Sequence, residues 1–339
     1  MNQANHPAPP SPALLFESVN AYQRTAAIRA SIELDIFSAI AEGKKSAAQL
    51  APRVKAAERG VRMLCDFLVV AGFLTKQNGE YGLTPDSALF LDRKSPAYSG
   101  SIVDFLLSPD LMRSFDHLTD AVRKGGTAEH GDGTVSVENP VWVKFARAMA
   151  PIMVPVGQKM AEILLNKSTP KMKVLDIAAG HGMFGLAIAR ANPNATIVAT
   201  DWKGVLEVAK ENAARFGVAD RFSTIPGSAF DVDFGTGYDL ILLPNFLHHF
   251  NVPTCEKLLK KARTALAPGG RVAAPEFIPN DDRVTPPPSA TFALVMLATT
   301  PSGDAYTLKE LTSMFKNAGF AKCELHSMAP MIQNMVIAE

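Results

Sequence analysis

Residues 172–201 read MKVLDIAAGHGMFGLAIARANPNATIVATD and decide the fold of this chain. An apolar run ends in Asp176, a glycine-containing turn and a helical pattern follow, and a second apolar run ends in Asp201. Glycines let the backbone approach a ligand, and an acid at the next strand tip can hydrogen-bond ribose hydroxyls. The stretch therefore predicts a pocket for a nucleoside-bearing cofactor.

Two cofactor classes fit this turn. Gly180, Gly182 and Gly185 satisfy the pattern G-x-G-x-x-G, which is typical of dinucleotide sites. We expect the first strand to deliver the Asp176 carboxylate to the mouth of the pocket, where it would repel a pyrophosphate at the helix N-terminus. The sulfonium and α-amino group of S-adenosylmethionine (SAM) would instead be attracted to it. The charge argument favours SAM; an NAD-dependent oxidoreductase and a turn without a ligand remain as alternatives.

Composition limits the class of protein. The 339 residues include 34 Lys and Arg against 33 Asp and Glu, so no whole-chain field attracts nucleic acid or an anionic membrane. Cys65, Cys255 and Cys323 have no metal-ligand spacing and indicate free thiols in a reducing compartment. No uninterrupted apolar run approaches the roughly 18 residues that span a bilayer, and residues 1–12 predict a flexible Pro-rich tail rather than a signal peptide. We expect a soluble, cytoplasmic protein with two domains and neither a membrane nor a nucleic-acid partner.

Residues 13–100 predict a mainly helical, winged-helix domain. Helical spacing covers 13 to about 40, 46–51 and 57–72, and short β runs at 73–75 and 81–83 flank a turn at Asn78-Gly79. The usual function of this outline is DNA binding. The segment, however, holds 11 Lys and Arg against 9 Asp and Glu and shows no clustered basic face. A DNA-binding regulator is therefore an alternative that the charge pattern does not favour.

The rest of the chain predicts an α/β fold. Residues 101–166 form a helical linker that could line a substrate site, with a Gly-rich break at 124–133 and with Pro151 and Pro155 expected to end or kink its last helix. From 167 to 339 strands alternate with helices, which indicates a Rossmann-like, doubly wound parallel sheet. The expected strands are 172–178, 195–201, 221–225, 238–243 and 270–277. The final runs, CELHSM and MIQNMVIA, are joined too closely for a parallel crossover and predict an antiparallel C-terminal hairpin.

Several separated motifs now resemble one family, the SAM-dependent O-methyltransferases of the plant caffeic-acid and bacterial polyketide type. The similar stretches are VLDIAAGHG, ATDW, PNFLHHFNVPTCEKLL, APGGRVAAPEFIP and PSGDAYTLKELTSMFKNAGF. The resemblance runs from about residue 13 to the end. It implies a homodimer through a winged-helix dimerisation domain at 13–100, a SAM-binding domain at 167–339, S-adenosylhomocysteine as a product, and O-methylation of a phenolic or enolic hydroxyl on a small hydrophobic molecule.

The resemblance also implies site residues. His248 corresponds to the general base and Glu276 to a carboxylate beside it. A neutral imidazole with a pKa near 6.5 suits the removal of a phenolic proton, and Glu276 could fix its tautomer. The positions that correspond to cofactor-binding residues are Asp176, Gly180, Gly182, Asp201, Trp202, Gly227, Ser228, Ala229, Phe230, Pro244 and Asn245. We expect Phe145, Met149, Met153, Phe292 and Met296 to line the acceptor pocket, because Met and Phe suit flat aromatic molecules.

The chain departs from the family pattern at four positions. Ala305, next to Asp304, stands where relatives carry a second base-flanking glutamate, and Ser228 stands where an acid contacts adenine. Pro244 replaces a lysine, and His249 replaces an acid. These departures leave open a SAM-bound enzyme of the pericyclase or hydroxylase type on the same fold.

Two further histidine expectations concern the site. Since His248 and His249 are adjacent, we expect their side chains to point apart and to form no metal site. His181, inside the glycine turn, is expected only to leave the backbone of that turn free.

Overall fold

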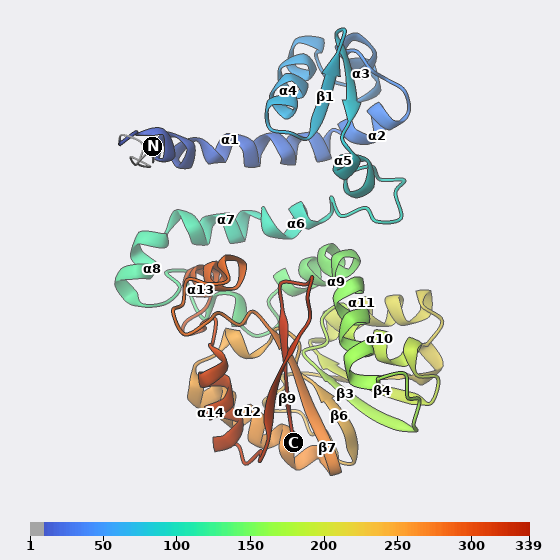
Figure 1. Cartoon of the computed structure of the whole chain (residues 1–339), viewed down its shortest axis with the longest axis vertical. Helices are drawn as coiled ribbons and strands as arrows, with labels where there is room; N and C mark the ends of the chain where they lie inside the picture. The colour runs from blue at the N-terminus through green and yellow to red at the C-terminus, as the bar shows by residue number, and fades with distance from the viewer. Residues whose placement is uncertain (1–9) are drawn as a thin grey trace, which may run out of the picture. The chain divides into compact units, whose positions relative to one another are not determined.

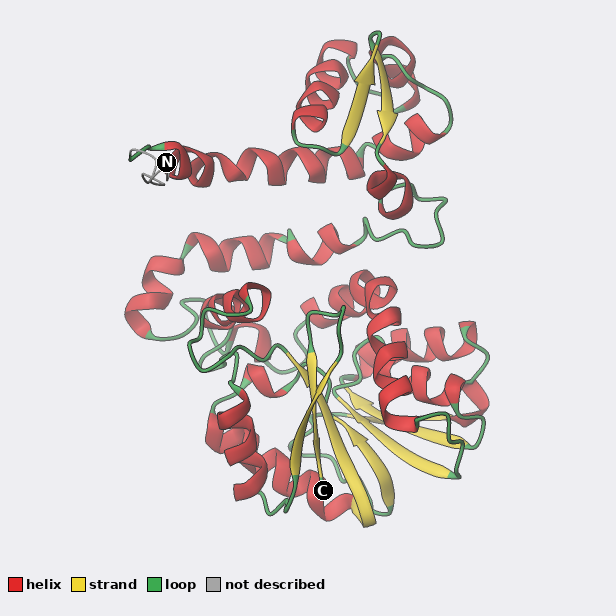
Figure 2. Cartoon of the chain, viewed as in Figure 1, coloured by secondary structure: helices red, strands yellow, loops and turns green. Residues whose placement is uncertain are grey.

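The computed structural model describes residues 10–339, so most of the expected flexible tail at 1–12 lies outside the described residues. The chain divides into two compact units, Met1–Gly100 and Ser101–Glu339. Figure 1 labels the helices and strands of both, and Figure 2 distinguishes helix, strand and loop.

The first unit is mainly helical and carries one hairpin. Its elements are α1 (Ala13–Glu33), α2 (Ile36–Ala41), α3 (Ala47–Arg53), α4 (Glu58–Val70), β1 (Leu74–Gln77), β2 (Glu80–Leu83) and α5 (Pro85–Phe90). β1 and β2 pair antiparallel around Asn78 and Gly79, whose φ angles are both positive, as a tight hairpin turn requires. The predicted order of helices followed by a hairpin is confirmed.

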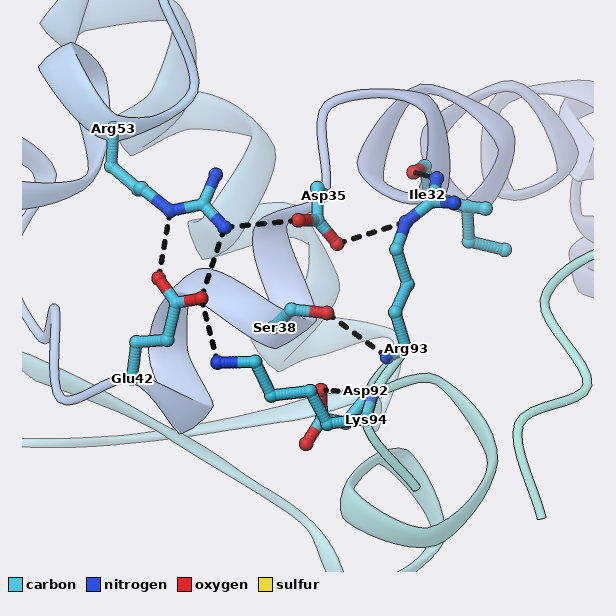
Figure 3. Close-up of polar contacts among 8 residues, drawn as sticks. All are labelled: Ile32, Asp35, Ser38, Glu42, Arg53, Asp92, Arg93 and Lys94. Carbon is cyan, nitrogen blue, oxygen red and sulfur yellow. Dashed lines mark hydrogen bonds and ion pairs between the residues drawn. The ribbon is translucent and has the colours of Figure 1, made fainter. Parts of the chain in front are cut away.

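The predicted continuous helix from residue 13 to about 40 is wrong at Asp35. This residue has a φ of 59° and separates α1 from α2. Figure 3 shows its carboxylate between two guanidinium groups, 3.1 Å from Arg53 and 3.0 Å from Arg93. Arg53 and Lys94 also pair with Glu42, at 2.7 and 3.1 Å. These ion pairs stabilise the break between the two helices. They also pair Arg53, Arg93 and Lys94 with carboxylates, whereas phosphate binding would require free cations.

The second unit begins with helices that lead to a long one. They are α6 (Ile102–Leu106), α7 (Pro109–Asp116), α8 (Leu118–Lys124), the short 3-10 turn η1 (Gly133–Val135) and α9 (Val141–Leu165). Pro151 and Pro155 lie inside α9, so the expectation that either ends this helix is wrong. Length and composition alone would let α9 cross a membrane. Its buried side chains, among them Met160 and Leu164, pack with residues of α10 and the sheet, as in a core helix.

A seven-stranded sheet forms the centre of the second unit. Its strands are β3 (Met172–Ile177), β4 (Ala195–Asp201), β5 (Phe222–Pro226), β6 (Tyr238–Leu242), β7 (Leu266–Glu276), β8 (Cys323–Ser327) and β9 (Asn334–Ala338). The order is β5-β4-β3-β6-β7-β9-β8; the first five strands are parallel, and β9 is antiparallel to both β7 and β8. The predicted Rossmann-like sheet with an antiparallel C-terminal hairpin is confirmed, and β7 begins four residues earlier than the predicted 270.

Helices cover both faces of this sheet (Figure 2). The remaining elements are α10 (Met183–Ala191), α11 (Lys203–Arg215), η2 (Ala219–Arg221), η3 (Leu247–His249), α12 (Val252–Ala265), α13 (Pro287–Thr299) and α14 (Leu308–Asn317). Leu175 and Ile177 of β3 pack in a core with α12 and α14, whereas Val174 packs with α9 and α10. This alternation follows from the two-residue period of a strand.

Candidate functional site

The predicted cofactor residues gather at the carboxyl ends of neighbouring strands. In the sheet, β4 lies on one side of β3 and β6 lies on the other, so the chain connections run in opposite directions from β3. The carboxyl end of β3 is therefore a topological switch point. Open parallel sheets bind ligands at such points. The loops after β3, β4, β5 and β6 carry every predicted cofactor position except Asp176 and Asp201, which lie in strands.

Asp201 ties the glycine loop to the next strand. Its Oδ2 accepts a hydrogen bond from the Gly180 amide at 2.8 Å, and its Oδ1 accepts one from the Trp202 amide at 2.7 Å. Gly180 and Gly182 have φ angles of 56° and 79°, which favour glycine. Burial raises the pKa of Asp201 to about 6, against the opposing effect of the two amides.

Asp176 does not lie at the mouth of the pocket, contrary to our prediction. Its side chain is completely buried, and Oδ2 accepts a hydrogen bond from the amide of Gly185 in α10 at 2.9 Å. Strand alternation explains the error, because Asp176 shares the α10-facing side of β3 with Val174. Burial raises the pKa of Asp176 to about 7, and Asp201 adds to the rise. Asp176 therefore fastens the start of α10 beneath the loop.

His181 does more than free the backbone of the loop. Its Nδ1 accepts a hydrogen bond from the Met183 amide at 3.1 Å, and its carbonyl accepts one from Asn212 at 2.9 Å. Its ring stacks on Phe145, with 5.8 Å between the ring centroids. The ring thus joins the loop to α9 as well as to α10.

The loops after β5 and β6 complete the cofactor edge. The Gly227 amide donates to the Asp201 carbonyl at 2.9 Å, and Ser228 Oγ accepts from the Phe230 amide at 3.1 Å. Asn245, which follows Pro244, has a φ of 51°, and its backbone N–H donates to the Pro275 carbonyl at 2.8 Å. Ala229 is buried in the adjoining core.

The residues at this edge fit SAM. Thr200 Oγ1 at the end of β4 and Asn245 Oδ1 in the loop after β6 are buried polar atoms with no hydrogen-bond partner among the described residues. A buried polar atom left without a partner costs about 1–3 kcal/mol, which indicates that a polar ligand belongs nearby. The glycine loop and the Asp201 carboxylate supply the close approach and the acceptor that a ribose requires.

His248 and Glu276 meet at the ends of β6 and β7. Glu276 Oε2 lies 2.6 Å from His248 Nδ1, and both side chains are buried. Glu276 Oε1 accepts hydrogen bonds from the amides of Phe246 and Leu247, each at 2.9 Å. The carboxylate is therefore fixed on both oxygens, as an orienting partner of an imidazole should be.

The η3 turn that carries His248 is fastened by three more contacts. The Leu247 carbonyl accepts from Cys255 Sγ at 3.1 Å, the His248 carbonyl from the Asp304 amide at 2.9 Å, and the Phe250 carbonyl from the Tyr306 hydroxyl at 2.5 Å. The sequence pattern did not predict the contact of Tyr306 or that of Cys255. The Tyr306 contact joins positions 56 residues apart, for which no local pattern exists, whereas Cys255 lies only eight positions after Leu247.

The expectation that His248 and His249 point apart is wrong. Their ring centroids are 4.3 Å apart, because the 3-10 turn places successive side chains closer together than a strand would. His249 is buried, its Nδ1 has no partner among the described residues, and its ring contacts Trp142 at 5.1 Å. Burial lowers the pKa of His249 well below its usual range, and His248 adds to this effect.

The position of the family's second glutamate supplies no carboxylate. Ala305 is completely buried, and the Asp304 side chain pairs with Arg283 at 3.2 Å. Glu276 is thus the carboxylate that contacts His248 in the described structure. The described residues contain no group of His, Cys, Asp and Glu that could hold a metal ion, and Cys65, Cys255 and Cys323 are free.

The predicted acceptor residues do not all reach the base. Phe292 does, with its ring 4.8 Å from that of His248. Phe145 lies instead over the cofactor loop, since a Cβ on Gly180 would be 3.5 Å from its ring. Met153, at 9% exposure, belongs to the core of α9 and α10 and is a core residue rather than a pocket wall, whereas Met149 is only partly buried against that core. Met296 is buried one turn beyond Phe292 on α13.

Comparison with known proteins identifies this arrangement. The O-methyltransferase domain model matches residues 115–321, and the O-methyltransferase dimerisation domain model matches residues 16–93. The chain is 26% identical over 337 residues to a 3-hydroxy-5-methyl-1-naphthoate 3-O-methyltransferase of Streptomyces sahachiroi, covering 96% of this chain and 94% of the relative.

Solved structures agree with the family models. A candidate O-methyltransferase from Nostoc punctiforme is 57% identical, covers 97% of this chain and 99% of its own, and superposes with a TM-score of 0.94. Human N-acetylserotonin methyltransferase in complex with SAM shares the fold at 22% identity, with a TM-score of 0.84 and coverage of 100% and 99%. The chain belongs to the SAM-dependent O-methyltransferase family and carries that family's dimerisation domain.

Proposed function

We propose that this enzyme methylates a phenolic or enolic hydroxyl on a small, hydrophobic molecule and that His248 is the general base. The observation that carries the assignment is the 2.6 Å contact between His248 Nδ1 and Glu276 Oε2. With Glu276 ionised, the proton of a neutral His248 ring lies on Nδ1, and Nε2 is left as a proton acceptor.

The chemistry requires a base and alignment. A phenol has a pKa near 10, so at neutral pH its oxygen is a poor nucleophile until its proton is removed. Nε2 of His248 would take this proton, and the carboxylate of Glu276 would stabilise the imidazolium that forms. When bound, SAM supplies a methyl group on a positively charged sulfur. Alignment of the acceptor oxygen supplies much of the remaining rate.

The cofactor would be held by the loops at the carboxyl edge. We assign the ribose contact to Asp201 and the surrounding contacts to Gly180, Gly182 and Trp202. The loops after β5 and β6 would enclose the remainder through Gly227, Ser228, Ala229, Phe230, Pro244 and Asn245. Asp176 has no exposed surface, so we assign it to the support of the loop instead of direct contact.

The acceptor would lie against aromatic and sulfur-containing side chains. Phe292 stacks on Phe277 with 4.1 Å between their centroids and makes a T-shaped contact with the His248 ring. With Met296 and Phe145, it would form an apolar wall suited to a flat ring. Met149, which is partly buried beside the α9 core, completes the set that we propose.

We further propose a cytoplasmic homodimer formed through the first unit, at residues 13–100. The match to the dimerisation model supports it. Large apolar side chains on α1 are exposed and would be covered in a dimer, namely Leu14, Leu15, Phe16, Val19 and Tyr22. Residues 101–166 would then connect this domain to the SAM-binding domain at 167–339.

A screen of hydroxylated aromatic compounds for the release of S-adenosylhomocysteine tests the proposal. Each compound is paired with the same compound already methylated on that oxygen, which should give no release. The His248→Ala variant should lower kcat on any active compound by about 10²–10⁴-fold while SAM affinity is unchanged. Full activity of His248→Ala would remove the base assignment, and release that persists with the methylated compounds would exclude O-methylation of that hydroxyl.

A further inference from the structure

The His181 ring lies at the positive end of α10. It is 2% exposed and sits between Gly180 and Gly182, two positions before Met183, the first residue of the helix. The amide of that residue, Met183, donates to Nδ1 at 3.1 Å. His181 is therefore held by the helix terminus to which it is joined.

The bond to Nδ1 fixes the proton on the other nitrogen. Burial lowers the pKa of His181 to about 3, so the ring is neutral at physiological pH. A neutral imidazole has one donor and one acceptor nitrogen. Because Nδ1 accepts, Nε2 carries the hydrogen, and this N–H donates to no acceptor among the described residues. Nε2 is not among the buried side-chain atoms that lack a partner, so this N–H is open to solvent or to a ligand.

Side chains already occupy two amides of the first turn of α10. Met183 donates to His181, and Gly185 donates to Asp176 Oδ2. Helix N-termini favour anions through their amides and their dipole. Here Nδ1 of His181 accepts a hydrogen bond from one of those amides, and Nε2 carries an N–H on the opposite side of the ring. The ring therefore presents a hydrogen-bond donor in place of the amide that it occupies. Bonds linked in this way strengthen one another.

Two aromatic rings set the orientation of this donor. Phe145 stacks on the imidazole, and Phe184 contacts it at 5.9 Å between centroids. Ring contacts use the faces of the imidazole, and hydrogen bonds use its edge. The N–H direction is consequently fixed by packing before a ligand binds, which lowers the entropic cost of a contact.

We propose that His181 Nε2–H donates a hydrogen bond to the α-carboxylate of bound SAM. The α-carboxylate is the anionic group of this cofactor, and the positive end of a helix is where an anion is favoured. Asp201, on the other side of the loop, is an anion and suits the ribose hydroxyls instead. His181 would thus recognise the amino-acid half of the cofactor, and Asp201 the nucleoside half.

Ligand truncation tests the contact. Isothermal titration calorimetry at pH 7.5 would compare S-adenosylhomocysteine with 5′-methylthioadenosine, which has no amino-acid group, on the wild type and on His181→Phe. The phenyl ring keeps the stacking on Phe145 and removes the N–H. We expect S-adenosylhomocysteine to bind about tenfold to a hundredfold more weakly, the range for a hydrogen bond to a charged group. The affinity for 5′-methylthioadenosine should not change.

Other outcomes would overturn the assignment in distinct ways. Equal losses for both ligands would mean that His181 acts on the nucleoside half, and no loss would mean that it does not contact the cofactor. His326→Phe, on the far edge of the sheet in β8, is the control for loss of an imidazole. If His181→Phe does not fold, His181→Gln, which keeps an N–H donor, should retain more selectivity for S-adenosylhomocysteine than His181→Ala. Failure of the wild type to bind either ligand would instead contradict the cofactor itself.

Discussion

Glu276 Oε2 lies 2.6 Å from His248 Nδ1, while the other oxygen of the same carboxylate is held by the amides of Phe246 and Leu247. Glu276 thus binds the imidazole and the backbone that carries it. Rotation of the carboxylate would break three contacts together. This rigidity sets the direction of the His248 ring and the position of its proton.

Exchange of Glu276 for Gln should lower kcat by about 10²–10⁴-fold, because an amide N–H facing Nδ1 would move the histidine proton to Nε2 and remove the acceptor that the substrate needs. The affinity for S-adenosylhomocysteine should stay within about twofold of the wild type. Steady-state kinetics and calorimetry measure the two quantities. A variant with normal kcat would show that the tautomer of His248 does not matter for the reaction.

Exchange of Tyr306 for Phe should lower kcat by about tenfold to a hundredfold, the cost of a small misplacement of a catalytic group. Its hydroxyl holds the Phe250 carbonyl at 2.5 Å and thereby the end of the turn that bears His248. KM for SAM should not change, because neither Tyr306 nor Phe250 is among the residues that we assign to the cofactor.

Tyr238→Phe is the matched control. The Tyr238 hydroxyl also donates to a backbone carbonyl, that of Phe234 at 2.6 Å. Tyr238, however, lies at the amino end of β6, whereas the site lies at the carboxyl ends of the strands. Both variants should lose about 1 kcal/mol in the free energy of unfolding. Equal effects of the two substitutions on kcat would reduce Tyr306 to a structural role.

Exchange of Asp176 for Asn should flatten the dependence of stability on pH. Burial raises the pKa of Asp176 from its ordinary 3.8 to about 7, so between these values the folded protein binds more protons than the unfolded chain. Its contribution is thus fully present below pH 3.8 and is lost as the pH rises toward 7. Urea unfolding without cofactor should show Asp176→Asn gaining stability over the wild type from pH 4 to 7. Parallel curves would contradict the raised pKa.

Binding of S-adenosylhomocysteine should weaken below pH 6. The pKa of Asp201 is raised to about 6, and the protonated acid is a poorer acceptor for ribose hydroxyls than the carboxylate. The affinity should be constant above about pH 7 and fall by up to about tenfold for each unit below 6. Calorimetry at pH 5, 6 and 8 measures this. Asp201→Ala should bind more weakly and show no such decline, and a wild-type affinity independent of pH would exclude the ribose contact.

Local patterns were sufficient to predict the strands, the hairpins and the edge at which the site lies. Alternating apolar residues, Asn78-Gly79 and the glycine loop each act within a few positions of themselves. Tertiary packing decided the rest. The burial of Asp176 depends on which side of β3 α10 covers, and the break at Asp35 depends on arginines from other segments.

The site shows the same division. His248 and Glu276 could be assigned from motifs, because each follows a recognisable strand. The helical spacing of Phe145 and Met153 on α9 could not reveal that Phe145 faces the cofactor loop while Met153 enters the core. Such spacing shows which residues share a helix face but not which element that face contacts. Tyr306 and Phe250 are 56 positions apart, so no local pattern could have paired them.

The strand order at the C-terminal edge bears on how the protein is made. β8 leaves the ribosome before β9, yet β9 is its single neighbour in the sheet and lies between it and β7. β8 must therefore wait for residues 334–338 before it can join, and the edge of β7 stays bare until then. Nascent chains halted within this stretch would present an open strand edge to one another, so we expect translation pausing there to promote aggregation.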